Sequence, residues 1–335
     1  MRIDLARPAG PTFLLAVAFC AAALAAALPA PEDALTGWLG AAVLFQSVPA
    51  SAVFFLMLMR LIPGAWERDL RVPCEAATAL LFPAAAAFVP VLFGIPFIYH
   101  WDGGASAFHA LWLQPLFFAA RTALYFAFLF WMVRLHVGRR PSAGAAAAGL
   151  ILFTLLATMA ATDWLMSLDP SFASSGFGLQ VLSIEVVIGF AALLLVRLAR
   201  GPAERPGVLG GLFLTLMLLW IYFQFMPYFI IWSGNLPDAV AWYQARKQAS
   251  WPLTLWLVAL IGGSTTAALL FSAFRANSRW LFTLAAATVG GKVLEMAWFA
   301  LPGRGAIAVL AYLAAVLGLA ILGVIQLLRR REAPT

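Results

Sequence analysis

Long apolar runs recur along nearly the whole chain, and they limit its fold more than any other feature. Hydrophobic residues make up 64% of the 335 residues and charged residues only 10%, whereas about 25% of a typical soluble domain is charged. A run of roughly 20 apolar residues can cross a bilayer as a helix, and lipid admits only helices and closed barrels. The sequence therefore predicts an all-α polytopic membrane protein, with residues 1–335 forming a single integral membrane domain.

Links that carry proline, glycine or charge divide the apolar runs into about ten predicted transmembrane helices. The first, with Arg2 and Arg7 before it and Ala27-Leu28-Pro29-Ala30 at its end, also resembles a secretory signal peptide. We expect it to be retained, because the charge pattern of the loops is consistent with ten spans. The ten predicted spans cover residues 11–30, 36–59, 74–97, 112–135, 143–166, 176–198, 207–233, 250–274, 279–301 and 305–328.

Basic residues lie on alternate loops, and this alternation orients the chain. Of the 21 Lys and Arg residues, 16 fall before the first span, after the last, or in every second loop. The opposite loops hold only Arg246, Lys247 and Arg304. The positive-inside rule therefore predicts that both termini are cytoplasmic. Topology also accounts for the net charge of +7, so no nucleic-acid partner is expected, and the lipid bilayer is the first partner.

Away from the first and last residues of each span, five charged residues fall well inside predicted spans, where an unpaired charge costs several kcal/mol. From the helical rise of 1.5 Å per residue, we expect all five to lie roughly 8–14 Å below the extracytoplasmic surface. Such residues commonly mark proton or substrate pathways. The shared depth predicts one buried polar cluster open to the outer side, built from Arg121, Asp163, Glu185, Lys292 and Glu295.

The spacing of these charges suggests how they pair. Lys292 and Glu295 are three residues apart, so they share a helix face and can neutralise each other. Arg121 needs a partner such as Asp163 or Glu185, and Tyr125, at i+4 from Arg121, could share that partner. These ions could serve only as structural tethers. In the functional alternative they form a proton path, with Asp163 as the first candidate for the protonatable group.

Thr154, Thr158 and Thr162 form a stripe on one helix face that ends beside Asp163. Their hydroxyls could carry a water wire inward from the carboxylate. Threonines in such positions also bond the carbonyl of the preceding turn of their own helix, or help helices to pack. Both alternatives remain open on the sequence.

Histidine content limits the cofactors that the chain could hold. The three histidines, His100, His109 and His136, all fall in predicted loops, whereas bundled b-type haems need paired histidines inside the bilayer. Cys20 and Cys74 lie far apart without a CxxC motif, which gives no indication of an iron–sulfur cluster. We therefore expect this chain to bind no cofactor of its own, apart from a quinone or quinol whose binding residues the sequence does not identify.

Several ordered stretches resemble the F-type membrane component of alternative complex III, a bacterial quinol:cytochrome c oxidoreductase. This component, also called quinone-binding subunit 2, belongs to the polysulfide-reductase-type membrane anchors. The most specific stretch is Asp-Trp-Leu-Met-Ser-Leu-Asp-Pro at 163–170. The whole set comprises Gly64–Arg68 with Glu75, Tyr99–Trp101, Phe117–Phe126, Asp163–Pro170 with Phe177–Gly178, Trp220–Tyr222, Tyr228–Trp232 with Asn235–Pro237, Trp242–Tyr243 with Arg246, Trp251, and Trp298 with Pro302.

The resemblance implies ten helices arranged as two antiparallel four-helix bundles plus a peripheral pair, in the bacterial cytoplasmic (inner) membrane. It also implies partner subunits that carry iron–sulfur clusters and haem c. A sister quinone-binding membrane subunit would hold the main quinol site, and this chain would serve as a proton route or scaffold. Glu185 and Lys292 depart from the family pattern as charges added to it.

These observations lead to one hypothesis and two alternatives. The hypothesis is a cofactor-free, non-catalytic membrane subunit of a quinol-oxidising respiratory complex, which helps to form or couple a quinol site and conducts protons through its buried charges. The first alternative is a secondary transporter, which would show inverted repeats and unwound central segments. The second is a purely structural membrane anchor with every ion paired.

Overall fold

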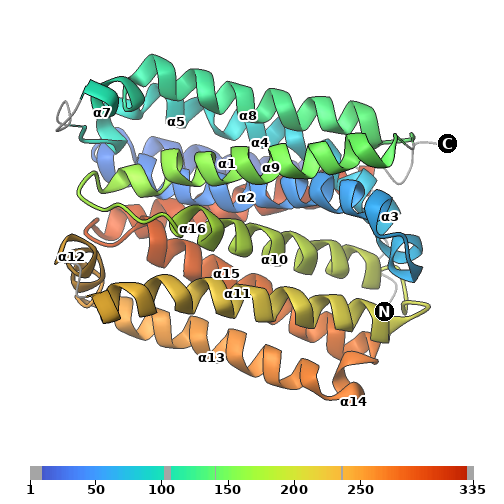
Figure 1. Ribbon diagram of the computed structural model, residues 1–335. Helices are drawn as coiled ribbons and strands as arrows, with labels where there is room; N and C mark the ends of the chain where they lie inside the picture. The colour runs from blue at the N-terminus through green and yellow to red at the C-terminus, as the bar shows by residue number, and fades with distance from the viewer. Residues whose placement is uncertain (1–9, 102–106, 140, 235–236, 330–335) are drawn as a thin grey trace.

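The structure, a computed structural model, describes residues 10–101, 107–139, 141–234 and 237–329, and within these ranges it holds helices and no strand. The long helices run side by side along one common direction (Figure 1). Eight of the described helical segments are long and apolar enough to cross a membrane. The prediction of an all-α protein with many spans is therefore confirmed in its coarse form.

Two helices form the centre of the molecule. They are α2 (Pro31–Leu61) and α10 (Phe177–Leu198), whose most apolar windows are 83% and 72% buried. They approach closely because Gly189 of α10 has no side chain where a Cβ would collide with Ser51 of α2. The Ser51 hydroxyl also donates a hydrogen bond of 2.9 Å to the carbonyl of Glu185. Small residues thus let the two central backbones meet.

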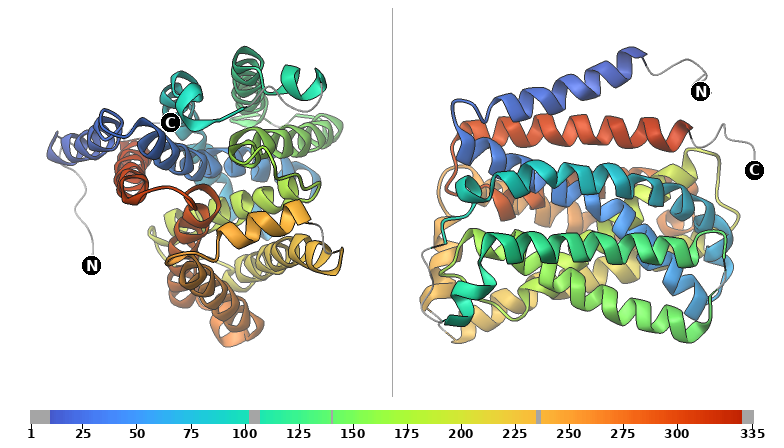
Figure 2. Two further views of the ribbon diagram at one scale, coloured as in Figure 1. Left: turned by 90° about the vertical axis from the view of Figure 1, so that its left-hand side faces the viewer. Right: turned by 90° about the horizontal axis from the view of Figure 1, so that it is seen from above.

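The remaining long helices surround this centre. On one side lie α8 (Pro115–His136) and α9 (Ala143–Trp164), and on the other lie α11 (Pro206–Gly234), α13 (Trp251–Leu270) and α15 (Ser278–Ala300). The end-on view in Figure 2 shows α1 (Gly10–Ala25) at one edge of the molecule. There α1 packs mainly against α16 (Ala306–Arg329), which in turn packs on α2.

The third predicted span, 74–97, corresponds to a span-length helical segment that is broken into shorter pieces. The helical segment begins earlier, at Ala65, and breaks at three points. Each break falls in the turn before a proline, namely Pro83, Pro90 or Pro96. A proline removes the hydrogen bond to the carbonyl four residues back and clashes with that carbonyl. The pieces are α3 (Ala65–Ala77), the 3-10 turn η1 (Thr78–Leu80), α4 (Leu81–Ala87), α5 (Val89–Phe93) and α6 (Ile95–Ile98).

The predicted span 250–274 also ends early. Phe271 adopts an extended conformation, with φ −89° and ψ 130°, which separates α13 from the short α14 (Ser272–Arg275). The other predicted spans match observed helices within a few residues. Among these, α15 coincides with predicted span 279–301 and the 16-residue α1 with span 11–30, although neither is among the eight segments that meet the length and hydropathy criteria.

Loops that the charge pattern assigns to one side do meet at one end of the molecule. Arg68 pairs with Glu204 at 3.8 Å, and Arg71 donates to the carbonyl of Arg139 at 3.4 Å. These contacts join α3 to the loops that follow α8 and α10, at the end marked by α3 and α14 (Figure 1). Five of the 16 orienting bases lie outside the described residues, namely Arg2, Arg7, Arg140, Arg330 and Arg331.

The opposite end carries the remaining short helices, which are α7 (Ala107–Trp112), the 3-10 turn η2 (Met166–Leu168) and α12 (Pro237–Ala245). Here Arg304 forms an ion pair with Glu32 and donates to the carbonyl of Ile98 at 3.4 Å. Arg246 donates to the carbonyl of Phe299 at 3.1 Å. The three bases assigned by sequence to the opposite loops are Arg246, Lys247 and Arg304, and two of them make contacts that tie this end together.

Candidate functional site

Arg121 on α8 and Asp163 at the end of α9 form a two-pronged ion pair. The Arg121 Nε lies 2.6 Å from Asp163 Oδ2 and its Nη2 lies 2.9 Å from Oδ1. Trp112 donates its indole N–H to Oδ1 at 3.0 Å, and its ring covers the guanidinium at 4.2 Å. Both charged side chains are buried, and these bonds offset part of the cost of desolvation, although Arg121 Nη1 is buried without a hydrogen-bond partner. The sequence left Asp163 and Glu185 open as partners of Arg121, and the structure selects Asp163.

The rest of the Asp163–Pro170 stretch ends α9 and fixes the turn that follows. Trp164 is buried in the core, with its ring 4.3 Å from that of Phe88. Tyr99 donates its hydroxyl to the Trp164 carbonyl at 3.0 Å, and Ser167 donates to the Asp163 carbonyl. The last carbonyl groups of a helix have no hydrogen-bond donor within the helix. The hydroxyls of Tyr99 and Ser167 donate to two of these carbonyls. The residues of this stretch therefore also have a structural role, which is to end α9 and to fix the turn after it.

Glu185 on α10 forms a second polar centre. Gln46 on α2 donates its amide to Glu185 Oε1, and the Tyr125 hydroxyl on α8 donates to Gln46 Oε1 at 3.3 Å. Glu185 Oε2 is buried without a hydrogen-bond partner, and within the described residues no salt bridge reaches this carboxyl group. A carboxylate buried without a cation is very costly, so the arrangement favours a carboxylic acid that holds its proton.

Lys292 and Glu295 on α15 form a third polar centre, as their spacing predicted. Lys292 Nζ lies 2.7 Å from Glu295 Oε2. Trp220 of α11 donates its indole N–H to Glu295 Oε1 at 2.9 Å, and Lys292 Nζ lies 3.4 Å from the centre of the Trp220 ring. The ammonium group is thus held by a carboxylate and an aromatic face, which compensates its burial.

The expectation of one cluster that joins all five charges needs correction. The first two centres border a hollow of about 20 Å³, lined by Arg121, Tyr125 and Asp163 among others, which has room for one water molecule. Glu295 instead lines a different and much larger pocket. The reason is that α15 packs against α10 and α13, so α10 lies between Lys292–Glu295 and the Arg121–Asp163 pair.

The threonine stripe does not point into either centre. Thr154 donates its hydroxyl to the Leu150 carbonyl at 3.0 Å, and Thr158 and Thr162 donate to carbonyls of the preceding turn of α9 at 2.9 and 3.0 Å. Thr158 and Thr162 line a surface hollow with Ser174 and Ser175, whereas Asp163 lines the small hollow beside Arg121. The hydroxyls follow the intrahelical alternative, and the water wire from Asp163 gains no support.

A pocket of about 410 Å³ lies between α10, α11, α13 and α15. Its lining is mostly apolar or aromatic and includes Trp220, Tyr228, Tyr243 and Trp298. Phe225, Tyr228 and Leu255 also line it and are exposed on the lateral surface, by 56%, 50% and 45%. In a bilayer the pocket would therefore open toward lipid rather than toward water.

Two residues that line this pocket carry a buried hydrogen-bond donor without a partner. Gln180 donates to Gln224 Oε1 at 2.8 Å, which leaves the Gln224 Nε2 group unpaired. The indole Nε1 of Trp298 is likewise buried without a partner. Leaving a buried donor unsatisfied costs roughly 1–3 kcal/mol. Two such donors in one apolar pocket point to a ligand that carries hydrogen-bond acceptors.

Tyr243 lines this pocket, and Arg246 follows it in the loop after α12. The Arg246 guanidinium stacks on the Trp242 ring at 3.3 Å and donates to the Trp242 carbonyl at 2.9 Å. Burial lowers the pKa of Arg246 to about 9, so the side chain still carries its charge at neutral pH. Burial also raises the pKa of Tyr243 to about 12, which keeps its hydroxyl protonated and able to donate.

Sequence reasoning missed the neutral residues that complete these centres. Gln46, Gln180 and Gln224 all lie within predicted spans, and an amide inside a span is itself a polar signal. The indoles of Trp112 and Trp220 complete the centres in the same way, by donating to Asp163 and Glu295. Within the described residues, no group of three or more His, Cys, Asp or Glu side chains is arranged to hold a metal ion.

Comparison with known proteins adds no family assignment. No protein-family model matches the chain, and no curated protein matches it either.

Proposed function

We propose that this chain is an integral membrane subunit of a quinol-oxidising respiratory complex in the bacterial cytoplasmic membrane, and that its large pocket receives a quinone or quinol headgroup. The observation that carries the proposal is the pair of unpaired buried donors, Gln224 Nε2 and Trp298 Nε1, in an aromatic pocket open to the lateral surface. Iron–sulfur and cytochrome c subunits, with a sister membrane subunit, would be its partners.

The pocket suits such a ligand in shape and chemistry. A quinone headgroup is a flat apolar ring with two oxygen acceptors on opposite edges, and it reaches proteins from the bilayer. Trp220, Tyr228 and Tyr243 offer aromatic faces to the ring. The amide of Gln224 and the indole of Trp298 offer donors to the oxygens. A quinol bound there would supply electrons to partner subunits and release protons.

The polar centres would handle those protons. Glu295 lines the pocket, and Lys292 beside it stabilises the negative charge of its carboxylate, so Glu295 is placed to accept a proton from the headgroup. Glu185, Gln46 and Tyr125 form a separate chain of hydrogen bonds. This chain reaches the water-sized hollow beside Arg121 and Asp163, which supports a second route for protons.

The stretches that carry the family resemblance gather at a few points in the fold. Tyr99 and Trp101 contact the end of α9 through bonds to the carbonyls of Trp164 and Ser167. In the other half, Trp242, Arg246 and Trp298 stack together. We further propose that α1 and α15 cross the membrane, which would give ten spans in two four-helix bundles plus the peripheral pair α1 and α16, with both termini cytoplasmic.

The broken third span is the one feature that a secondary transporter would share, since transporters bind substrates at unwound helices. Residues 78–98 carry no charged side chain. Within the described residues, the intramembrane charges of Arg121, Asp163, Glu185, Lys292 and Glu295 all lie on unbroken helices. The placement of charge therefore favours the quinol-linked subunit over the transporter.

Purification of the tagged chain from its native membranes tests the proposal. We expect haem c and iron–sulfur proteins to copurify, with quinol:cytochrome c oxidoreductase activity that falls when Gln224→Leu and Trp298→Phe are combined. A matched control is Trp256→Phe, since Trp256 is 74% exposed on the lipid-facing side of α13. Isolation of the chain alone, with solute uptake in vesicles and no redox partners, would contradict the proposal.

A further inference from the structure

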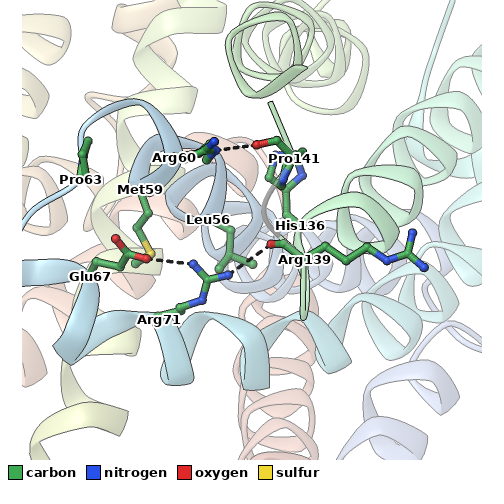
Figure 3. A pocket seen from close by; sticks show the side chains of 9 residues that line it. All are labelled: Leu56, Met59, Arg60, Pro63, Glu67, Arg71, His136, Arg139 and Pro141. Carbon is green, nitrogen blue, oxygen red and sulfur yellow. Dashed lines mark hydrogen bonds and ion pairs between the residues drawn. The ribbon is translucent and has the colours of Figure 1, made fainter. Parts of the chain in front are cut away.

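A second hollow, of about 50 Å³, lies at the end of the molecule where the basic loops meet (Figure 3). The side chains of Arg60, Arg71, Arg139 and His136 line it together with the apolar Leu56 and Met59. These residues come from α2, α3, α8 and the loop after α8. The hollow has room for a group of a few heavy atoms, since one water needs only about 10–15 Å³.

The protein itself holds two of the arginines in place. Arg71 pairs with Glu67 at 3.0 Å and with Glu75 at 3.1 Å, one turn before and one turn after it on α3. Arg60 donates its Nε to the carbonyl of Pro141 at 2.5 Å, as Figure 3 shows. These guanidinium groups are therefore anchored from the side, and the arrangement does not depend on a ligand to form.

His136 supplies the observation that points to a ligand. Its side chain is buried, and its Nδ1 lies 3.0 Å from the Met132 carbonyl of the same helix. A carbonyl can only accept, so Nδ1 carries the hydrogen. The Nε2 atom lies on the opposite edge of the ring, where it is buried without a hydrogen-bond partner. Nε2 of this neutral ring is a hydrogen-bond acceptor, so a guest that carries a hydroxyl group would satisfy it.

The charge of the hollow and its position at the helix ends indicate which class of ligand it can bind. The three arginines outnumber Glu67 and Glu75, so the site has an excess of positive charge with neutral His136. The hollow lies at the ends of α2 and α8, which is the depth of lipid phosphates for a helix that spans the bilayer. Basic pockets at the cytoplasmic ends of spans bind anionic lipid headgroups.

We propose that this hollow binds the phosphate group of an anionic phospholipid from the cytoplasmic leaflet. Arg60 and Arg139 would neutralise the phosphate, and the neutral His136 would accept a hydrogen bond at Nε2 from a hydroxyl of the lipid headgroup. Leu56 and Met59 would contact the start of the lipid's apolar part. Lipid binding here is independent of the quinol-linked function, because it concerns only the chain and its bilayer.

Lipid retention by the purified protein tests this inference. The protein is reconstituted in nanodiscs of phosphatidylcholine with increasing phosphatidylglycerol, and bound phosphatidylglycerol is counted by native mass spectrometry. Each phosphate contact near a membrane surface is worth about 1 kcal/mol, which is roughly a fivefold change in affinity. We expect Arg60→Gln to weaken retention about fivefold and the double variant Arg60→Gln/Arg139→Gln about 25-fold. We expect Arg60→Lys to restore most of the retention and His136→Gln to weaken it.

Arg279→Gln is the matched control, because Arg279 is an exposed base at the same end but outside the hollow. Unfolding temperatures in detergent show whether each variant is still folded. Equal phosphatidylglycerol retention in the wild type and the double variant would overturn the proposal, as would an equal loss in the Arg279 control. Displacement of the lipid by millimolar inorganic phosphate would show that the site serves a soluble anion instead, which would also overturn it.

Discussion

Asp163 and Glu185 show how neighbours decide what a buried carboxyl group can do. Asp163 accepts two bonds from Arg121 and one from Trp112, so its charge is matched and its position is fixed. Glu185 has an amide partner and no cation within the described part of the chain. The structure therefore moves the first candidate for a proton-holding group from Asp163 to Glu185.

The Arg121–Asp163 pair makes a prediction about stability. Asp163→Asn removes one charge and leaves Arg121 buried without its counter-ion, which typically destabilises a protein by about 3–5 kcal/mol. We expect a clear loss of unfolding free energy in detergent. The double variant Arg121→Gln/Asp163→Asn should recover part of it, because no unpaired charge remains. An unchanged unfolding midpoint for Asp163→Asn would mean that the pair does not stabilise the fold.

For Glu185 we expect the opposite effect on stability, a small change when its carboxyl group is replaced by an amide. If its carboxyl group holds a proton, Glu185→Gln replaces it with a neutral group of similar shape, and stability should fall by no more than the roughly 0.5–1.5 kcal/mol of one hydrogen bond. The infrared spectrum of the wild type should contain a protonated carboxyl stretch that the variant lacks. A spectrum with no such difference between the two proteins would show that Glu185 is ionised.

The contact between α2 and α10 leaves no room for a side chain at Gly189. Gly189→Val would drive a side chain into Ser51 and toward the Ser47 carbonyl. Overpacking of this kind typically costs about 1–3 kcal/mol, so we expect the unfolding temperature to fall. Gly290→Val is the matched control, because nothing lies within 4 Å of a Cβ at that helical glycine. Equal stability of the two variants would contradict this packing.

Helix-level features differ in how far the sequence could predict them. Apolar length predicted most spans well, because hydrophobic thickness sets helix length directly. Apolar length did not predict the breaks before Pro83, Pro90 and Pro96, because the mean hydropathy of a long window is insensitive to single prolines. Charge inside a span identified Arg121 and Lys292. The amides and indoles that complete the centres, and the pocket between α11 and α13, depend on which helices become neighbours, and no local pattern encodes that.

At the scale of the whole molecule, the orientation in the membrane can be tested directly. We expect a cysteine at exposed Gln248, in the loop after α12, to react with a membrane-impermeant maleimide in intact cells. A cysteine at exposed Ala276, in the loop after α14, should react only after permeabilisation. Both variants are made in a chain in which Cys20 and Cys74 are replaced. The reverse labelling pattern would place the termini outside and contradict the assigned topology.

Our central claim is that the pocket between α10, α11, α13 and α15 binds a quinone headgroup through Gln224 and Trp298. Its most direct test is a titration of the protein, isolated with any subunits that copurify, with a short-chain quinone that quenches tryptophan fluorescence. We predict saturable binding that Gln224→Leu/Trp298→Phe weakens by about 5- to 150-fold, from two hydrogen bonds of roughly 0.5–1.5 kcal/mol each. Trp256→Phe should leave the affinity unchanged. Equal affinity in the wild type and the double variant would contradict the claim.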